Sequence, residues 1–331
     1  MSDTRFDVLT IGNAIVDIIA RAEDDFLVER GIVRGAMNLI DAARAEELYA
    51  AMGPALEASG GSAANTAAGV ASLGGRAAYF GKVAADPLGE VFAHDMRASG
   101  VHFGSKPLAA PPPTARSMIF VTPDGERSMN TYLGACVELG PEDIEAEVVA
   151  GAAVTYFEGY LWDPPRAKEA IRLAASIAHR HRRQFSMTLS DPFCVDRYRD
   201  EFLELMRTGT VDLVFANESE LKSLYQTASF DSALDAIRGD CATAVVTRSE
   251  KGCVVVTSKE TFAVPAYPVS RIVDTTGAGD QFAAGYLYGI TNGRDAAASA
   301  RIGAFAAARV IEQVGPRVME PLKPMIDAAG L

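Results

Sequence analysis

Apolar runs of strand length alternate with longer segments of helical periodicity from residue 141 onward, and this alternation restricts the folds open to the chain. The expected strands are residues 153–157, 184–189, 211–216 and 243–248, with a hairpin at 252–257 and 261–264. The expected helices are residues 141–149, 165–181, 200–208, 219–225, 231–238, 295–309 and 321–328, with another that begins near Asp280. Strands that helices separate pair in parallel, in a sheet that helices cover on both faces. The pattern therefore predicts an α/β fold with a mostly parallel central sheet.

The first part of the chain departs from this alternation, because several strand-like runs have no helix between them. Residues 6–12 and 76–81 indicate two strands of the ordinary kind. The unseparated runs lie at about residues 14–21, 33–40, 114–122 and 128–133. Asp124-Gly125 between the last two is typical of a hairpin turn. We predict a single domain over residues 1–331, with these strands forming a small antiparallel sheet that serves as a lid.

The net charge of the chain restricts the classes of partner that it can bind. The formal net charge is -12, whereas a nonspecific nucleic-acid binder or a protein of anionic membrane surfaces needs a basic face. The start of the sequence shows no signal-peptide pattern, and no apolar stretch has the length of a membrane span. We expect a cytoplasmic protein that binds a small molecule. It is expected to be a monomer, or a homodimer formed through the exposed edge of the lid sheet.

The stretch Asp274-Thr275-Thr276-Gly277-Ala278-Gly279-Asp280 joins a strand-like segment to a helix. The first amides of a helix lack intrahelical partners and carry partial positive charge, so they can hold a phosphate. The two glycines let a ligand approach the backbone closely. Asp280 in the first turn could accept a proton from an alcohol while the amides hold the phosphoryl group. The alternative, that Asp280 only complements the helix dipole, stays open on these residues alone.

Two earlier segments carry polar residues that suit a ligand with hydroxyl groups. Asp17 interrupts an apolar run, where an acid is costly unless it has a partner. It faces either solvent at a sheet edge or the hydroxyls of a ligand. Gly60-Gly61 precedes a helix of small residues in which Asn65 lies one turn from the start. These glycines either bring amides to a ligand or form a tight turn that only serves packing.

Two later segments follow strands. Asn217 and Glu220 come directly after the expected strand 211–216, and such a pair can hold hydrated Mg²⁺ through water. The same two residues also fit a helix capping box, and the two interpretations are compatible. Thr247 to Gly252 forms a polar turn before the hairpin, on which a nucleotide could lie.

In the segments that contain Asn13 and Asp17, Gly61 and Asn65, Asn217 and Glu220, and the stretch 274–280, the chain resembles the ribokinase (pfkB-type) family of carbohydrate kinases. The four segments match in order and span essentially the whole chain. The resemblance implies a ribokinase-like three-layer αβα fold and ATP-dependent phosphorylation of a sugar hydroxyl. It implies that Asp280 is the base and that the amides of Gly277, Ala278 and Gly279 form the anion hole.

The resemblance also implies roles for the other matched residues. Asp17, Gly61 and Asn65 would bind the hydroxyls of the acceptor, and Asn13 and Asn38 would also belong to the acceptor site. Asn217 and Glu220 would organise Mg²⁺ and phosphate, while Thr247, Gly252 and Thr276 would border ATP. Many members hold a monovalent cation such as K⁺ near the anion hole, and Asp274, Thr276 and Gly315 occupy similar positions. Arg127, on the second strand of the lid hairpin, could reach the transferred phosphate, or it could be a surface arginine.

The resemblance also bears on which molecule accepts the phosphoryl group. Within the family, the segments around Ile15, Met37 and Met129 most resemble bacterial members related to adenosine kinase. A nucleoside needs an apolar slot for its base, which Ile15, Met37, Met129, Phe157 and Tyr160 could line. Each of these could instead be a packing residue of the lid or core. The resemblance therefore implies adenosine first, with a sugar such as ribose or fructose as the alternative. A protein that senses a nucleoside or nucleotide without catalysis is a third possibility, against which the intact Gly-Ala-Gly-Asp turn argues.

Overall fold

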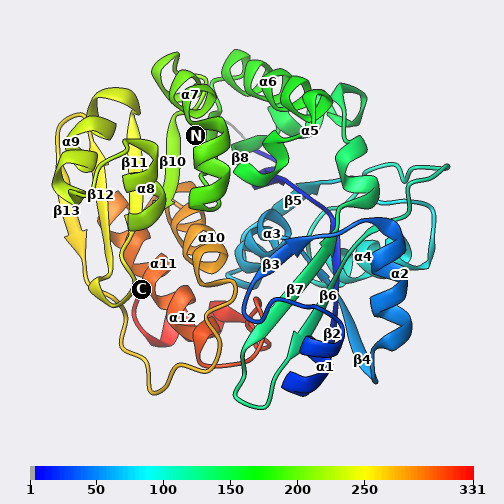
Figure 1. Cartoon of the computed structure of the whole chain (residues 1–331). Helices are drawn as coiled ribbons and strands as arrows, with labels where there is room; N and C mark the ends of the chain where they lie inside the picture. The colour runs from blue at the N-terminus through cyan, green and yellow to red at the C-terminus, as the bar shows by residue number, and fades with distance from the viewer. Residues whose placement is uncertain (1–3) are drawn as a thin grey trace.

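Two β-sheets organise the computed structural model, which describes residues 4–331 (Figure 1). The larger sheet has eight strands in the order β13-β12-β11-β10-β9-β8-β1-β5. Their bounds are β1 (Phe6–Ile11), β5 (Ala77–Phe80), β8 (Ala152–Glu158), β9 (Gln184–Thr188), β10 (Leu213–Asn217), β11 (Thr243–Thr247), β12 (Cys253–Thr257) and β13 (Thr261–Val264). All neighbours pair in parallel except β11 with β12 and β12 with β13, which are antiparallel. The predicted mostly parallel central sheet is confirmed.

Helices cover both faces of the larger sheet, because its inner strands are apolar on both sides. Every residue of β1 is buried, as a strand between two helical layers requires. One layer consists of α5 (Ala146–Ala150), α6 (Pro165–Arg180), α7 (Pro192–Arg207), α8 (Glu218–Leu224) and α9 (Phe230–Asp240). The other consists of α3 (Ser62–Ser72), α10 (Ala278–Thr291), α11 (Ala296–Ile311) and α12 (Leu322–Ala328). The three-layer αβα arrangement is thus confirmed (Figure 1).

The smaller sheet, which we call the lid after its predicted role, has the strand order β3-β7-β6-β2-β4. Its strands are β2 (Ile15–Arg21), β3 (Met37–Leu39), β4 (Ala55–Gly60), β6 (Ala115–Val121) and β7 (Arg127–Tyr132). Along β2 the buried residues alternate with half-buried ones, so one face of the lid packs on helices and the other is free for a ligand. The helices that cover it are α1 (Asp24–Glu29), α2 (Ala42–Ala51) and α4 (Pro87–Ala98).

Several predictions about the lid were wrong. The sheet is mixed rather than antiparallel, because β2 pairs with β6 and β3 with β7 in parallel. Long connections separate these partners in the chain, and such connections permit parallel pairing. The strand expected at 33–40 is confined to Met37–Leu39, since Gly35 adopts a left-handed conformation just before it. Strand β4 was not predicted, because Ala55–Gly60 has almost no apolar pattern.

Two helices also differ from the prediction. The helix expected at 200–208 begins at Pro192, because Asp191 caps its first turn by accepting a hydrogen bond from the Cys194 amide at 2.6 Å. The segment expected as one helix at 141–149 contains a 3₁₀ turn (Pro141–Asp143) and then the short helix α5. Ile144 between them has an extended conformation, which ends the first turn.

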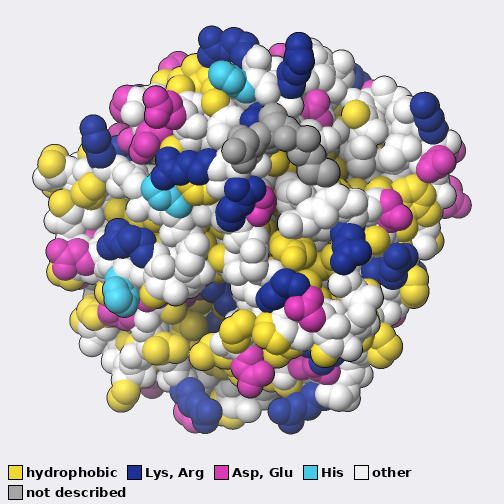
Figure 2. Space-filling view, turned by 180° about the vertical axis from the view of Figure 1, so that it is seen from behind, with side chains coloured by type: hydrophobic (Ala, Val, Ile, Leu, Met, Phe, Trp, Pro, Cys, Tyr) yellow, Lys and Arg dark blue, Asp and Glu magenta, His cyan; other side chains and the backbone are white. Residues whose placement is uncertain are grey.

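The fold brings the polar motifs to one place. The carboxyl ends of β1, β8, β10 and β11 lie at one edge of the larger sheet, together with the first turns of α3 and α10, and the lid faces this edge (Figure 1). Ligands bind at this edge in open α/β sheets. On the back of the molecule, acidic and basic side chains are interspersed (Figure 2). Within residues 4–331, no helix is both long enough and apolar enough to cross a membrane.

Candidate active site

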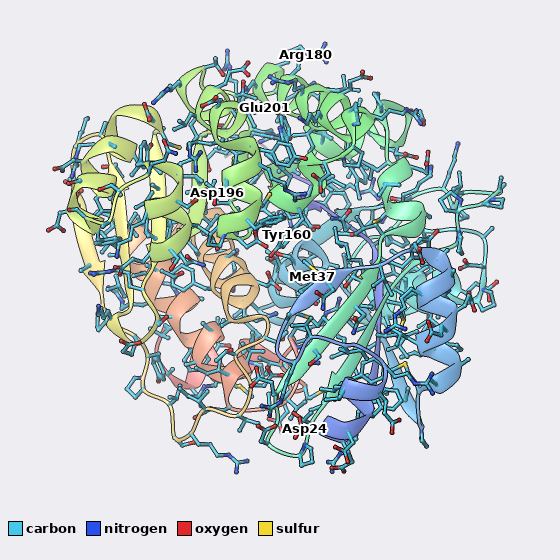
Figure 3. All side chains as sticks on the ribbon, in the orientation of Figure 1. Asp24, Met37, Tyr160, Arg180, Asp196 and Glu201 are labelled. Atoms are coloured by element: carbon cyan, nitrogen blue, oxygen red, sulfur yellow. The ribbon has the colours of Figure 1, made fainter. Side chains whose placement is uncertain are left out.

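A cavity of about 910 Å³ lies between the lid and the carboxyl edge of the larger sheet. Most of the predicted site residues line it: Asn13, Ile15, Asp17, Met37, Asn38, Gly61, Asn65, Met129, Tyr160, Asn217, Glu220, Thr247, Thr276, Gly277, Ala278, Gly279 and Asp280. Met37 of the lid and Tyr160 of the main body face the space between them (Figure 3). The cavity runs from the lid to Thr247 at the end of β11, so one continuous space could hold two ligands in line.

Helix α10 begins in this cavity with free backbone donors. Its N-cap, Gly277, has φ 77°, a left-handed conformation that favours glycine. The Ala278 amide donates to the Thr275 carbonyl oxygen at 3.3 Å. The amides of Gly277 and Gly279 make no hydrogen bond within residues 4–331. An added Cβ at Gly279 would meet no atom within 4 Å, because this position faces the open cavity. The turn therefore presents at least two unpaired amides to a ligand, as an anion hole requires.

The Asp280 carboxylate is fixed in the first turn of α10. One oxygen accepts a hydrogen bond from the Ser62 hydroxyl at 2.6 Å, and the other accepts from Asn65 Nδ2 at 3.0 Å. Burial raises the pKa of Asp280, and the bonds from Ser62 and Asn65 and the charge of Arg317 oppose this rise. Because a carboxylate has about four lone-pair sites, it can still accept a proton from a ligand hydroxyl. Its two donors hold it in position for that role.

Asp17 is an acid without a hydrogen-bonding partner. Among residues 4–331, no group donates a hydrogen bond to its carboxylate, which lines the cavity and lies against the backbone of Gly60. A Cβ at Gly60 would lie 2.4 Å from an Asp17 oxygen, so only glycine leaves room for the carboxylate there. Burial raises the pKa of Asp17 to about 6, opposed by the charges of Arg127 and Arg317. A half-buried acceptor of this kind, which faces the cavity, is suited to the hydroxyls of a ligand.

Glu158, at the end of β8, was not predicted as a site residue. It is 1% exposed, and its carboxylate accepts the Asn13 amide at 2.9 Å and the Ala63 amide at 2.7 Å. It thereby joins the turn after β1 to the first turn of α3, which carries Ser62 and Asn65. Burial raises its pKa to about 7, and the two amide bonds oppose this. The sequence held a signal for it, since an acid directly follows the apolar strand 153–157.

Asn217 and Glu220 form the predicted capping box at the start of α8. The Asn217 side chain accepts the Glu220 amide at 2.8 Å, and a Glu220 oxygen accepts the Asn217 amide at 2.9 Å. Both residues also line the cavity. Burial raises the pKa of Glu220 to about 7, opposed by the bonds from Asn217. No group of three or more acids, histidines or cysteines in the described part of the chain could hold a metal ion.

Asp274 and Arg127 form an ion pair, with Arg127 Nη1 2.6 Å from an Asp274 oxygen. The Asp274 carboxylate also accepts the Thr276 amide at 2.9 Å and the Gly315 amide at 2.8 Å. Burial raises the pKa of Asp274, but these bonds and the charge of Arg127 outweigh it and hold the pKa below its ordinary value. The three residues predicted to hold K⁺ do lie together. However, a guanidinium already neutralises the carboxylate, so the geometry gives the K⁺ prediction no support.

Comparison with known proteins identifies the family. A model of the pfkB family of carbohydrate kinases matches residues 32–323, which is most of the chain. The chain belongs to the pfkB family of carbohydrate kinases. This pfkB protein is 29% identical to adenosine kinase of Saccharomyces cerevisiae over 332 residues, which cover 93% of this chain and 96% of the relative. The family assigned from the sequence is confirmed, and the protein is a kinase that transfers a phosphoryl group to an alcohol.

Solved structures agree with this assignment. The crystal structure of adenosine kinase from Sinorhizobium meliloti is 66% identical to this pfkB chain, with a TM-score of 0.92, over 98% of this chain and 99% of that one. The crystal structure of a probable sugar kinase from Rhizobium etli CFN 42 is also 66% identical, with a TM-score of 0.93, over 99% of both chains. The ribokinase-like fold predicted for the chain is thereby confirmed.

A few predicted residues lie outside the cavity lining of the pfkB chain. Arg127 and Asp274 lie just behind it as the ion pair described above, and Gly315 bonds to that pair. Phe157 was expected to line a base slot but packs in the core against Trp162 and Phe185, so that expectation was wrong. Gly252 is not in the lining, and its φ of 81° and closeness to the Val264 carbonyl explain why it is glycine.

Other lining residues were missed by sequence reasoning. Ser62 lies inside the matched segment, between Gly61 and Asn65, but was given no role there. Phe193 and Arg197 of α7 line the cavity mouth, and the Phe193 side chain is largely exposed with the Arg197 guanidinium over its ring. These two lie on the helical turns that precede the predicted start of their helix. Their omission therefore follows from the error in that boundary.

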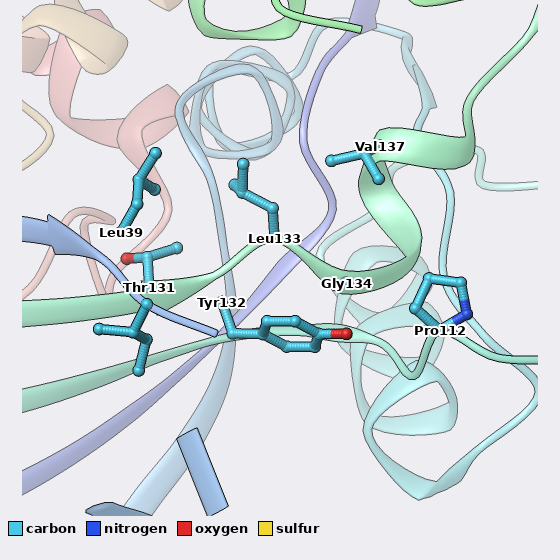
Figure 4. A pocket seen from close by; sticks show the side chains of 8 residues that line it. Leu39, Pro112, Thr131, Tyr132, Leu133, Gly134 and Val137 are labelled. Carbon is cyan, nitrogen blue, oxygen red and sulfur yellow. The ribbon is translucent and has the colours of Figure 1, made fainter. Parts of the chain in front are cut away.

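A smaller cavity of about 270 Å³ lies at the outer end of the lid, where β7 passes into a 3₁₀ turn, Gly134–Glu138. Figure 4 shows its lining, with the Tyr132 ring extending toward Pro112. Leu39, Thr131 and Leu133 line both cavities. The smaller cavity is therefore an extension of the lid interface in this pfkB protein rather than a separate polar site.

Proposed function

We propose that this chain is an ATP-dependent adenosine kinase, which transfers the γ-phosphate of ATP to the 5′-hydroxyl of adenosine. The observation that carries the proposal is the pairing of Asp280 with the unpaired amides of Gly277 and Gly279 in one wall of the cavity. A base beside positioned donors is what phosphoryl transfer to an alcohol needs. The 66% identity to a protein named adenosine kinase supports the choice of acceptor.

In this proposal, Asp280 accepts the proton of the acceptor hydroxyl as that oxygen attacks the phosphorus. The hydrogen bonds from Ser62 and Asn65 keep its carboxylate in one orientation during the step. The amides of Gly277 and Gly279 donate to the phosphoryl oxygens, where negative charge concentrates in the transition state. Helix α10 adds its dipole at the same point.

The lid side of the cavity suits a nucleoside. Asp17 offers an unpartnered acceptor for the ribose hydroxyls, with Asn13, Asn65 and Gly61 beside it. The apolar residues that could hold a flat base line the same part of the cavity, with Tyr160 opposite the lid: Ile15, Met37, Leu39, Ile119, Met129, Leu133 and Tyr160. Asn38 on β3 supplies a polar group among them. Polar groups at one end of an apolar slot match the two halves of adenosine.

The opposite end of the cavity suits ATP. Thr247 and Thr276 line it, together with Asn217 at the carboxyl end of β10 and Glu220 in the first turn of α8. The donor set fits Mg²⁺, because this ion is often bound through one or two protein oxygens and several waters. The raised pKa of Glu220 also indicates a carboxylate that a cation would stabilise. When bound there, Mg²⁺ would neutralise charge on the phosphates.

A sugar kinase is the second candidate, because the Rhizobium etli neighbour with 66% identity is named a probable sugar kinase. The same Asp280 chemistry would serve either acceptor. The deciding experiment measures ATP consumption with Mg²⁺ against adenosine, other nucleosides, ribose, fructose and no acceptor. Turnover with adenosine well above the sugars supports the proposal, and turnover with a sugar alone overturns the acceptor. Absence of turnover with every acceptor, together with nucleoside binding, would favour a sensor. The cytoplasmic location and the oligomeric state stay predictions.

A further inference from the structure

Arg317 lies in the segment between α11 and α12 and contacts Asn65 of the cavity lining, and no motif in the sequence singled it out. Its Nε donates a hydrogen bond to Asn65 Oδ1 at 2.9 Å, and its Nη1 donates to the Ser59 hydroxyl at 2.8 Å. Arg317 is not part of the cavity lining. It therefore acts on the site through the residues that it contacts.

The bond to Asn65 fixes the orientation of the Asn65 amide. An arginine side chain can only donate hydrogen bonds, whereas an ionised carboxylate can only accept them. Asn65 must therefore present its oxygen to Arg317 and its nitrogen to Asp280, as the distances of 2.9 Å and 3.0 Å show. A continuous chain of hydrogen bonds thus runs from Ser59 through Arg317 and Asn65 to Asp280.

The segment that carries Arg317 is itself held to the anion-hole turn. Gln281 Nε2 donates to the carbonyl oxygens of Pro316 and Asn65, both at 3.2 Å. A Cβ on Gly277 would lie 2.5 Å from the Pro316 oxygen, so Pro316 packs directly on the N-cap of α10. These contacts hold the backbone next to Arg317, while the guanidinium itself bonds the side chains of Asn65 and Ser59.

Arg317 also places a positive charge among several acids. The charged or titratable groups that face Arg317, Asp17 and Asp280 come from six packed elements: Asp17 of β2, Tyr79 of β5, Asp95 of α4, Arg127 of β7, Tyr156 and Glu158 of β8, and Asp280 of α10. Arg127 acts on Asp17, whereas Arg317 acts on both Asp17 and Asp280. Two carboxylates beside one cavity repel each other unless a cation lies near both.

We propose that Arg317 is a positioning residue for phosphoryl transfer, which orients the Asn65 amide toward Asp280 and offsets the negative charges of Asp17 and Asp280. This proposal rests on the proposed kinase function, because it assigns Arg317 a part in keeping the base ready. It adds a residue outside the matched motifs to the catalytic machinery of this chain. Asp280 remains the group that touches the acceptor.

The first experiment measures kcat and KM for adenosine and ATP as functions of pH in wild type, Arg317→Met and Arg317→Lys. We expect Arg317→Met to lower kcat by about tenfold or more and to move its acidic limb upward by roughly one pH unit, since an opposite charge at close range shifts a carboxyl pKa by about 1–3. Arg317→Lys keeps the charge but not the planar donor to Asn65. In this variant the acidic limb should lie close to its wild-type pH, while kcat should recover only in part.

The matched control is Arg309→Met, on α11. Arg309 lies over the rings of Tyr267 and Phe305 and pairs with Glu312, but it does not line the cavity. It should leave the acidic limb unchanged. If Arg317→Met fails to fold, Arg317→Lys decides: wild-type kcat with a wild-type limb would overturn the proposal, and a reduced kcat with a wild-type limb would support it.

A second measurement separates this proposal from the kinase function. Titration of ¹³Cγ-aspartate by NMR, with Asp17→Asn and Asp280→Asn to assign the two resonances, follows both carboxyls without any turnover. We expect both midpoints to rise in Arg317→Met relative to wild type. Unchanged midpoints would overturn the charge role of Arg317 even if adenosine is phosphorylated. A rise in an enzyme that phosphorylates no acceptor would uphold that role and discard the proposed function.

Discussion

Arg127 Nη1 lies 2.6 Å from an Asp274 oxygen, and this contact joins the second hairpin strand of the lid to the turn that begins α10. Both side chains are more than nine-tenths buried, at 8% and 9% exposure. Two further nitrogens of the guanidinium, Nε and Nη2, are buried without a hydrogen-bonding partner among the described residues. The lid and the anion hole are therefore coupled through this charged contact. The two unpaired nitrogens of the same arginine remain able to donate hydrogen bonds to a bound anion.

Breaking this pair from one side should destabilise the protein more than removing both partners. Arg127→Met leaves the Asp274 charge buried, and we expect a loss of roughly 3 kcal/mol in the free energy of unfolding, at the low end for buried pairs. Arg127→Met combined with Asp274→Asn should lose less than the sum of the single variants. Urea unfolding of all four proteins measures this coupling. Arg34→Met, which breaks an exposed lid pair with Asp124, is the control and should change stability little. Strict additivity would contradict the coupling.

Asp280→Asn tests the base. Asparagine keeps the size of the side chain and an oxygen to accept from Ser62, but it cannot take a proton from the acceptor. We expect kcat to fall by roughly 10²- to 10⁴-fold, while adenosine binding measured by calorimetry stays nearly the same. Asp295→Asn is the control, because Asp295 caps α11 away from the cavity and asparagine caps equally well. Unchanged turnover in Asp280→Asn would remove Asp280 from the base role.

Local signals were enough to predict much of the fold and the center of the site. The turn at Gly277 and the cavity positions of Asp17, Asn65 and Asp280 follow from short motifs whose physics lies within a few residues. Strand β4 could not be predicted, because half of Ala55–Gly60 is exposed and its pairing with β2 provides the only reason for its extended form. The parallel pairing of β2 with β6 likewise depends on contacts between distant segments.

The supporting contacts that sequence reasoning missed are those that depend on a distant partner. Glu158 is defined by the amides of Asn13 and Ala63, which no local pattern brings to it. Arg127 was predicted to reach a phosphate, but its contact with Asp274 could only come from the packed lid. Arg317 follows a Gly-Pro pair in an irregular segment, where an arginine would ordinarily be taken for a surface residue. Motifs thus identify the residues that touch ligands better than those that support them.

The raised pKa of Glu158 should make the free energy of unfolding depend on pH. Burial raises its pKa from 4.5 to about 7, so between these values the folded state binds more protons than the unfolded state. Stability should therefore fall as pH rises through this window, by roughly 3 kcal/mol in all from this group. Glu158→Gln carries no such proton, so its stability relative to wild type should rise between about pH 5 and pH 8 in urea unfolding. Exposed Glu204→Gln is the control. A constant difference between wild type and Glu158→Gln would contradict the shift.

Gly279→Ala distinguishes an effect on catalysis in the cavity from an effect on the stability of the fold. The added Cβ meets no protein atom within 4 Å and the residue lies in helix α10, so folding should gain roughly 0.5–1 kcal/mol from the better helix former. The methyl group stands where the phosphoryl group must approach the amides, so we expect kcat to fall on the order of tenfold to a hundredfold. Gly239→Ala is the matched control, because this glycine of α9 is equally open but lies outside the cavity lining. Thermal unfolding and steady-state kinetics measure both effects. If both variants gain stability and keep full turnover, the anion hole does not lie at Gly279.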